Sequence, residues 1–540
     1  MTDREQFELE RETIDREARA RGISREELLR RAAAAGITIG FAGRNLDAAF
    51  AAPAAPKPKR GGTFRLGVSG GSAKDLIDGE HIITRPDQAR ISSGWEGLVR
   101  FNPKYKVVQD SLAKEISAKR ADVWTIRLRK GVEFHNGKTM TADDVIYSLR
   151  RMLDPSLGLF GGSAIKGSVD PNGIRKLDKY TVRLKLKRRD ANLLDELAQY
   201  TCNIVPVGYK RWPDPQNGTG PYKLQSFTPG QRSVHVRNPN YWRHGQPFFD
   251  QVIVIDLPDD TARVNALLSG QVDAITDVPP AQVPIVNGRS NTRVLESPSA
   301  NWTPICMRVD SPPFNDVRVR RAMRLIANRP QIVRQALSGH ARVGNDLYAP
   351  FDENFAHFPQ RHQDIARARS LLKAAGHEGL TVDLQTTNGV IGQNETAHVF
   401  AQQARAAGVT INVKELSSGE FYGPNYLKWV FSTDFWGTRN YLSQVASGSL
   451  PTAPFNETHW NNARFNRLYN EALATVNRKK RREIEHEMQK MEYDSGGYII
   501  ASFSTLLDGF NTRVKGLQRG DRGILPLNGF GHGYRTIWFG

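Results

Sequence analysis

Ser69 stands in Gly67-Val68-Ser69-Gly70-Gly71, the G-x-S-x-G spacing that puts a nucleophilic serine on a sharp turn in one class of hydrolases. The alternating segment before it, TFRLGV, predicts the strand that such a turn follows. The residues after it, SAKDLIDGE, are too polar for the apolar helix that should come next, and no Asp and His stand out as partners. A Ser69-dependent hydrolase is therefore an alternative that the rest of the sequence does not favour.

Sulfur and imidazole groups are too sparse for metal or thiol chemistry. The chain has two cysteines, Cys202 and Cys306, and lacks the paired Cys spacing of a zinc site or a redox motif. The sequence leaves open whether these two cysteines form a disulfide. Twelve histidines are scattered, and none forms the i, i+4 pair that ligates a metal from one helix face. We expect no metal and no cofactor.

The net charge of +19 in 540 residues raises the question of a nucleic-acid partner. Residues 1–60 hold 12 Lys or Arg against 10 Asp or Glu, which leaves 63 against 46, or +17, for the rest. The densest basic run, Arg478–Arg482, is followed by three alternating glutamates, as on a solvated helix face. Because no base-reading module is visible, we expect no nucleic-acid binding. The basicity suits an anionic membrane surface or an acidic ligand instead.

Residues 1–60 predict an export signal and a linker. Arg30 and Arg31 precede AAAAGITIGFAG, a stretch as long as a signal's hydrophobic region, and the small-residue pattern AFA at 49–51 suits cleavage. The arrangement resembles a twin-arginine signal. The alternative is an amphipathic cytoplasmic tail. No cysteine lies nearby for a lipid anchor, and no stretch has the roughly 18 consecutive apolar residues of a membrane-spanning helix.

The remaining sequence alternates strands with helices, which predicts an α/β fold. VWTIRLRKGV and TVRLKLKR alternate like half-buried strands, and VIVIDLPDD has the unbroken apolar run of a strand covered on both faces. Thr141 begins a helix that Pro155 ends, and Asp259 or the aspartate after it begins another. Further long helices are predicted at VRVRRAMRLIA, at IARARSLLKAAG with Gly376 as terminator, and over Phe465–Met491.

Eight segments occur in the order found in the large binding proteins of peptide, nickel and oligosaccharide importers: RGGTFRLG, WEGLVRF, LRKGVEFHNGKTMTADDVIYSLRRMLDP, GTGPYKL, RNPNYW, ALLSGQVDA, PPFNDVRVRRAM and ARSLLKAAG. The chain thus resembles the family 5 extracellular solute-binding proteins of ABC importers. The resemblance implies a periplasmic-binding-protein type II fold, with two α/β lobes, a hinge and an inserted third domain. The implied limits are 61–100, 216–308 and 498–540 for lobe I, 101–215 for the inserted domain and 309–497 for lobe II.

The same resemblance implies capture of a solute and no catalysis. We expect an exported protein, in the periplasm or at the outer face of the cytoplasmic membrane, that holds a small solute between its lobes and delivers it to the membrane permease of an ABC importer. Closure of the lobes would trap the solute, and the protein would act as a monomer. A ligand-sensing receptor of the same fold is the alternative, and no sequence feature separates the two.

In peptide-binding family members, an acidic residue shortly after the tryptophan of a GW-type segment receives the peptide's α-amino group. The matching segment here carries Arg439 at that position, so the resemblance implies an anionic or polyhydroxylated solute, opine-like, sugar-conjugated or peptide-like, rather than an ordinary peptide. Arg439 could instead face solvent or pair with Asp434, and Trp436 is either core or a stacking platform. The ligand-binding candidates, the last two by their place at the cleft mouth, are Arg439, Trp436, Asn440, Tyr441, Asp434, Trp302, Asn388, Ser69 and Gly70.

Overall fold

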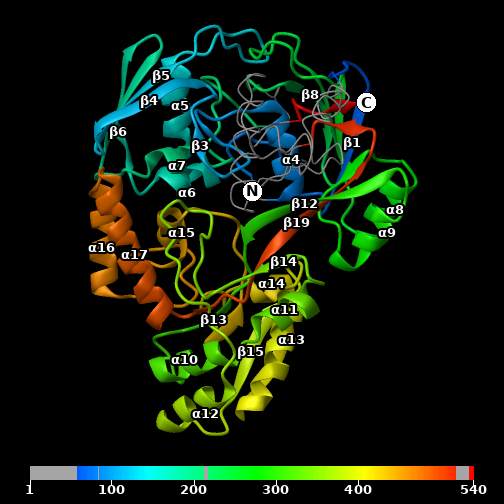
Figure 1. Ribbon diagram of the computed structural model, residues 1–540. Helices are drawn as coiled ribbons and strands as arrows, with labels where there is room; N and C mark the ends of the chain where they lie inside the picture. Colours follow the sequence, from blue (N-terminus) through cyan, green and yellow to red (C-terminus); the bar gives the residue numbers. More distant parts are fainter. Residues whose placement is uncertain (1–56, 83, 212–216, 518–533) are drawn as a thin grey trace, which may run out of the picture. The chain divides into compact units, whose positions relative to one another are not determined.

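The computed structural model describes residues 57–82, 84–211, 217–517 and 534–540 (Figure 1). Arg60–Phe539 form one compact unit. The predicted export signal, with Arg30, Arg31 and the cleavage pattern at 49–51, lies outside the described residues. Within the described part of the chain, no helix is both long enough and apolar enough to cross a membrane.

An eight-stranded mixed sheet is built around β1, which runs parallel to β10 on one side and to β11 on the other. The predicted strand VIVID forms β10, with Val252 and Val254 fully buried and the two isoleucines half-buried. Asp259 caps the next helix, as predicted, because it accepts the backbone N–H of Ala262 at 2.7 Å. In sheet order the strands are β12 (Thr292–Asn301), β19 (Ser502–Asn511), β11 (Ala274–Ile275), β1 (Thr63–Val68), β10 (Gln251–Asp256), β9 (Arg232–Arg237) and β8 (Tyr222–Thr228), with β14 (Ala341–Val343) beside β19. The helices against this sheet are α4 (Arg85–Gly94), α8 (Asp260–Leu268) and α9 (Val283–Asn287).

A four-stranded antiparallel sheet has the order β4, β5, β7, β6, and its two central strands are the alternating segments predicted above. Trp124 and Ile126 of β5 are buried, and the residues between them are more exposed. Helix α5 packs against β6 and β7. It begins after Thr141, whose backbone N–H donates to Asp144 at 2.9 Å, and it ends just before Pro155, both as predicted. The elements of this region are β2 (Arg100–Phe101), β3 (Val107–Val108), β4 (Ala113–Arg120), β5 (Val123–Leu128), β6 (Val169–Asp178), β7 (Thr181–Leu186), α5 (Ala142–Leu153), α6 (Phe160–Ile165) and α7 (Leu193–Leu197).

A five-stranded sheet has the order β16, β15, β17, β13, β18, with β15 parallel to β16 and β17. Two predicted helices form beside it: VRVRRAMRLIA contains α10, and IARARSLLKAAG contains α12, which ends just before Gly376 at φ 77°. The strands are β13 (Ile305–Met307), β15 (Thr381–Thr387), β16 (Thr410–Leu416), β17 (Phe431–Thr433) and β18 (Tyr498–Ile499). The helices are α10 (Val317–Ile326), α11 (Arg329–Ala336), α12 (Ile365–Ala374), α13 (Gln393–Ala404), α14 (Ser418–Phe421), α15 (Tyr441–Gly448), α16 (Ala463–Ala474) and α17 (Arg478–Ser495). A short pair, β20 (Val514–Lys515) and β21 (Trp538–Phe539), stands apart from the three larger sheets.

The prediction of one helix over Phe465–Met491 is wrong, because α16 and α17 are separate helices. Thr475 has extended backbone angles and closes α16. Asn477 then caps α17 by accepting the backbone N–H of Lys480 at 3.0 Å. A β-branched residue followed by a good N-cap therefore outweighs the apolar periodicity at this point.

Two segments cross between the eight-stranded and five-stranded sheets: residues 301–305, from β12 to β13, and residues 499–502, from β18 to β19. The first crossing follows a bulge, where the register of β12 against β19 shifts between Pro298 and Asn301. The second crossing is tied to the loop after β14, because the backbone N–H of Ile500 donates to the Asp346 carboxylate at 2.9 Å. The two crossings are therefore held in different ways, the first through a bulge and hydrogen bonds to Thr438 and Trp436, the second through a buried carboxylate.

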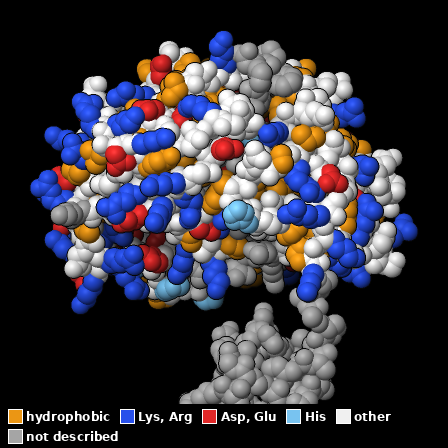
Figure 2. Space-filling view, turned by 90° about the horizontal axis from the view of Figure 1, so that it is seen from above, with side chains coloured by type: hydrophobic (Ala, Val, Ile, Leu, Met, Phe, Trp, Pro, Cys, Tyr) orange, Lys and Arg blue, Asp and Glu red, His pale blue; other side chains and the backbone are white. Residues whose placement is uncertain are grey.

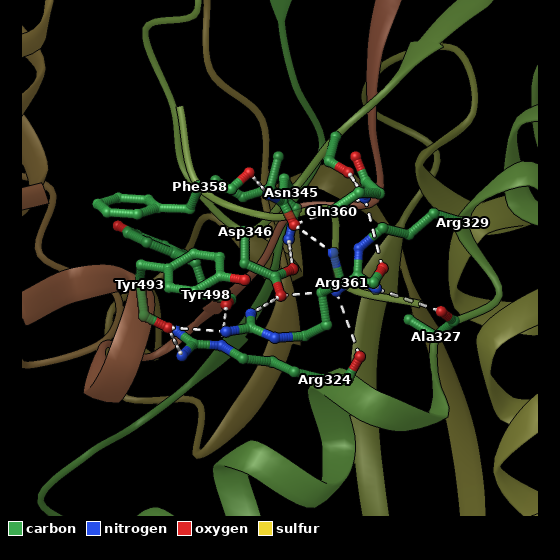
Figure 3. Close-up of polar contacts among 12 residues, drawn as sticks. Arg324, Ala327, Arg329, Asn345, Asp346, Phe358, Gln360, Arg361, Tyr493 and Tyr498 are labelled. Carbon is green, nitrogen blue, oxygen red and sulfur yellow. Dashed lines mark hydrogen bonds and ion pairs between the residues drawn. The ribbon is translucent and has the colours of Figure 1, made fainter. Parts of the chain in front are cut away.

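Asp346 is buried in a cluster of arginines beside the second crossing (Figure 3). Its carboxylate pairs with Arg329 at 2.6 Å and with Arg361. Arg324 donates to the carbonyls of Tyr493 and Tyr498, at the end of α17 and the start of β18. Burial alone would raise the pKa of Asp346, but the nearby Arg329, Arg361 and Arg324 more than offset burial and lower the pKa to about 2.

Candidate functional site

Trp302 and Trp436, two predicted site residues, face each other where the first crossing begins. Each donates its backbone N–H to the carbonyl of the other, at 3.0 and 2.9 Å, and their rings stack with centroids 6.1 Å apart. Tyr348 stacks on Trp302 at 5.5 Å, and Tyr441 stacks on Tyr348 at 5.4 Å. All four side chains are at most 6% exposed. This aromatic stack thus belongs to the core, and only a small part of Trp436 is open to a solute in this conformation.

Arg439 follows the aromatic stack and is half-buried. Its guanidinium lies over the Trp436 ring, 5.6 Å from the centroid, and donates a hydrogen bond to the Ser447 hydroxyl on α15. None of the ion pairs among the described residues involves Arg439. The Asp434 carboxylate accepts the backbone N–H of Phe435 at 2.7 Å instead. Arg439 therefore keeps a cationic face without a carboxylate partner in the described part of the chain.

Asp434 lies on the other side of Trp436 in the sequence and is buried with a second carboxyl, Glu457. The Tyr498 hydroxyl donates to Glu457 at 2.6 Å. Burial raises the pKa of Asp434 to about 7, and burial together with Asp434 raises the pKa of Glu457 well above its usual range. Near neutral pH the pair carries less than its full negative charge, so it does not cancel the charge of Arg439.

The residues around Arg439 contact the region of the four-stranded sheet. The Tyr105 hydroxyl donates to the Thr438 carbonyl at 2.7 Å. Asn440 donates its side-chain N–H to Asp195 on α7 at 2.6 Å. Burial raises the pKa of Asp195 to about 7, so this carboxyl is also only partly charged. The segment around Arg439 is therefore in contact with a part of the chain more than two hundred residues away.

Two of the predicted ligand-binding residues, Tyr441 and Asn388, do not contact Arg439. Tyr441 is fully buried, and its hydroxyl donates to Glu492 at 2.7 Å, which makes it a structural residue of the aromatic stack. Asn388 is exposed just after β15, and no hydrogen bond among the described residues links it to Arg439. Both residues were predicted from the sequence as ligand-binding candidates. In the structure they lie where they make no hydrogen bond with Arg439.

Ser69 and Gly70 lie at the carboxyl end of β1, where ligands of α/β sheets commonly bind. The Ser69 hydroxyl donates to Asp277 at 2.6 Å, and Gly70 is exposed with φ 88°. Arg85 lies 3.7 Å from the Asp277 carboxylate. No described histidine is a hydrogen-bond partner of Ser69, so the arrangement needed for an activated serine nucleophile is not assembled in the described residues.

The cysteines, the metal-ligating side chains and the cavity of the described residues suggest no second site. Cys202 and Cys306 are both free and buried, which answers the question that the sequence left open. Among the described residues, no group of three or more His, Cys, Asp or Glu side chains could hold a metal ion. A small cavity of about 10 Å³ beside Asp346 and Glu492 has room for one water molecule and is too small for a solute.

Sequence reasoning missed several residues that surround Arg439. Ser447, Tyr105, Asp195 and Glu457 each contact it or a neighbour in the segment 434–440. Ser447 lies near the end of α15, about two helical turns after Arg439. A helix predicted to begin at Tyr441 would have placed the two residues on the same side. The other three come from distant parts of the chain, and no local pattern marks them.

Comparison with known proteins identifies the family and the fold of this chain. Residues 107–450 match the family described as bacterial extracellular solute-binding proteins, family 5, middle region. Heme-binding protein A of Haemophilus influenzae is 26% identical over 468 residues, covering 78% of this chain and 83% of that protein. The glutathione-binding protein GsiB of Escherichia coli is 24% identical over 468 residues, covering 82% of this chain and 88% of that protein.

Two solved structures show the same fold. The binding protein AgaA of A. tumefaciens R10, in complex with agropinic acid, has a TM-score of 0.75 and 21% identity, covering 89% of this chain and 99% of that one. DppA of Helicobacter pylori, in complex with the peptide STSA, has a TM-score of 0.75 and 18% identity, covering 89% of this chain and 98% of that one. These proteins bind different solutes on one scaffold, so the scaffold alone does not name the solute of this chain.

Proposed function

This chain belongs to the family 5 bacterial extracellular solute-binding proteins, which capture a small solute for an ABC importer, and we propose that its own solute is anionic and is bound by Arg439 beside Trp436. The observation that carries the proposal is the half-buried guanidinium of Arg439, which has no carboxylate partner among the described residues. A guanidinium offers a planar pair of donors that matches a carboxylate or a phosphate.

The charges around Arg439 favour an acid over a free-amine peptide. A fixed guanidinium repels an ammonium group, and Asp434 and Glu457 offset that repulsion only in part, because their pKa values are raised. The polar groups near Arg439, including Ser447 and Asn440, also suit the hydroxyls of a sugar conjugate or an opine-like compound. Agropinic acid, the ligand of AgaA, is a solute of this chemical class.

Solute capture by lobe closure remains part of the proposal. The eight-stranded sheet draws its long strands from 61–100, 216–308 and 498–540, the four-stranded sheet lies within 101–215, and α10 to α17 lie within 309–497, which supports lobe I, an inserted domain and lobe II. Strands β13 and β18 belong to the five-stranded sheet, so the limits at 308 and 498 move to the two crossings, near 304 and 500. We expect an exported monomer whose radius of gyration falls when the solute binds. Identical small-angle scattering curves with and without a tightly bound solute would count against closure.

The test compares solutes and variants by isothermal titration calorimetry. The probes are agropinic acid, reduced glutathione and the free-amine tripeptide Ala-Ala-Ala, with native mass spectrometry of the fresh protein to find a co-purified solute. We expect an acidic probe or an acidic co-purified solute to bind, and Arg439→Ala to weaken it by about 2–5 kcal/mol. Arg439→Lys should recover part of this loss, because the lysine keeps the charge and loses the planar fork.

The matched control is Arg334→Ala, which removes the charge of an exposed arginine on α11 that has no ion pair among the described residues. This variant should bind the acidic probe like the wild type. Unchanged affinity in Arg439→Ala would show that the solute does not meet this guanidinium. Preference of the wild type for Ala-Ala-Ala would show that the solute class is wrong, even if binding still depends on Arg439.

A further inference from the structure

One face of the four-stranded sheet carries a row of cationic side chains. Buried residues alternate along β5 and β7, so the residues between them point to the opposite face, away from α5. Register places Arg175 of β6 opposite Arg183 of β7, Arg183 opposite Thr125 of β5, and Thr125 opposite Ser117 of β4. Lys185 lies two residues along β7 on the same face. We call this surface the basic sheet face, with Arg175, Arg183 and Lys185 as its cations.

The basic sheet face is a concentrated part of the protein's positive charge. The segment that contains its three cations, residues 166–189, holds nine Lys or Arg and two Asp, a net charge of +7 out of +19 in 24 of 540 residues. The other cations of this segment lie off the face, and Lys176 pairs with Asp143 of α5. Arg175, Arg183 and Lys185 are exposed, and none of them has an ion pair among the described residues. Figure 2, a view from above, shows many Lys and Arg side chains with acidic side chains scattered among them.

Repulsion between two arginines on the basic sheet face would be reduced by an anionic partner. Arg175 and Arg183 are directly opposite each other on adjacent strands, and like charges in that position destabilise a sheet. An anionic surface that covers the pair removes the repulsion and gains the attraction. The fold of this region needs no such pair for packing, since the buried residues all lie on the other face.

We propose that the basic sheet face docks the protein on an anionic phospholipid membrane. A protein partner would be expected to use an apolar or aromatic centre. The outward residues of β5 and β7 are charged or polar except for the half-buried Val123, and β6 exposes a single apolar side chain, Leu177, rather than an apolar centre. A lipid surface needs only a flat array of cations, as an open antiparallel sheet provides. The importer that receives the solute is a membrane protein, so such docking keeps the loaded protein close to it.

The experiment measures co-sedimentation of the full-length protein with vesicles. One set of vesicles contains 30% phosphatidylglycerol in phosphatidylcholine, and the other contains phosphatidylcholine alone, each at 20, 150 and 500 mM salt. Each cation near an anionic membrane strengthens binding about fivefold. The triple variant Arg175→Gln, Arg183→Gln, Lys185→Gln should therefore bind the anionic vesicles about 100-fold more weakly at 20 mM salt, and the binding of the wild type should fall steeply with salt.

A second triple variant, Arg334→Gln, Arg405→Gln, Lys414→Gln, removes the same charge from exposed positions near the five-stranded sheet. It should bind anionic vesicles within about threefold of the wild type. Circular dichroism and binding of the solute should be unchanged in both variants, so a failure here is distinct from a failure at Arg439. Equal loss in both triple variants, binding to neutral vesicles, or salt-insensitive binding would each overturn the proposal. Capture by an acidic protein or by heparin without vesicle binding would also overturn it.

Discussion

Asp346→Asn tests the electrostatic account of the second crossing segment. In the folded protein the carboxylate is buried, pairs with Arg329 and Arg361, and accepts the backbone N–H of Ile500 at 2.9 Å. Its pKa is lowered from 3.8 to about 2, and at 1.36 kcal/mol per pKa unit this corresponds to about 2.5 kcal/mol of stability at neutral pH. Asparagine keeps an acceptor for Ile500 but leaves the guanidinium groups without their counter-ion, so we expect a total loss of about 3–5 kcal/mol.

The pH dependence distinguishes this account from a packing defect. Because the folded pKa lies below the unfolded one, the contribution of Asp346 is complete above about pH 4 and is lost as the pH falls through 2. The difference in unfolding free energy between wild type and Asp346→Asn should therefore shrink by about 2 kcal/mol between pH 6 and pH 2. Urea unfolding followed by tryptophan fluorescence measures it at each pH. The control Glu378→Gln, at an exposed site, should change stability by less than about 0.5 kcal/mol. A pH-independent difference, or a loss below about 1 kcal/mol at pH 7, would refute the reasoning.

Two further predictions concern groups whose pKa is raised by burial. Asp434 has a folded pKa of about 7, so the folded protein keeps a proton that the unfolded chain has lost, and the wild type should lose stability relative to Asp434→Asn as the pH rises from 5 to 8. Differential scanning fluorimetry across that range measures the gap, and a constant gap would contradict the prediction. Burial raises the pKa of the Cys202 thiol to about 12 and that of Cys306 well above its usual range, so neither should react with an aromatic disulfide reagent at pH 8 in the folded protein. Both should react in 8 M urea without prior reduction, and fewer than two thiols there would show a disulfide.

Elements with strong local signals were predicted well from the sequence. The strand around Trp124 and the helix that begins at Thr141 formed where alternation and capping residues placed them. The break between α16 and α17 was missed because the capping signal at Asn477 lies inside a run of helix-forming residues. A single N-cap contributes only about 1 kcal/mol, so the sequence alone does not show whether the cap or the surrounding helix-forming residues decide the structure.

The candidate site was predicted only in part. The sequence indicated Trp302, Trp436 and Arg439 as candidates for one site, and in the structure the rings of Trp302 and Trp436 stack and Arg439 lies over Trp436. Pairing of Trp302 with Trp436 is an isolated bridge between two segments that are more than one hundred residues apart, and no periodicity in either segment predicts it. The contact of Tyr105 with Thr438 is likewise set by tertiary packing.

The different support of the two crossing segments limits how the two sheets can turn against each other. The strand that leaves Ile500 is fixed at its start by Asp346, whereas the strand that reaches Trp302 passes through a bulge at 298–301. A rotation between the sheets would therefore have its axis near Ile500, and the backbone dihedral changes would be concentrated in the bulge. Trp302 follows the bulge directly, so the same rotation would tilt its ring against Trp436 and change the fluorescence of both indoles. The aromatic stack would then serve as a built-in optical reporter of the angle between the sheets.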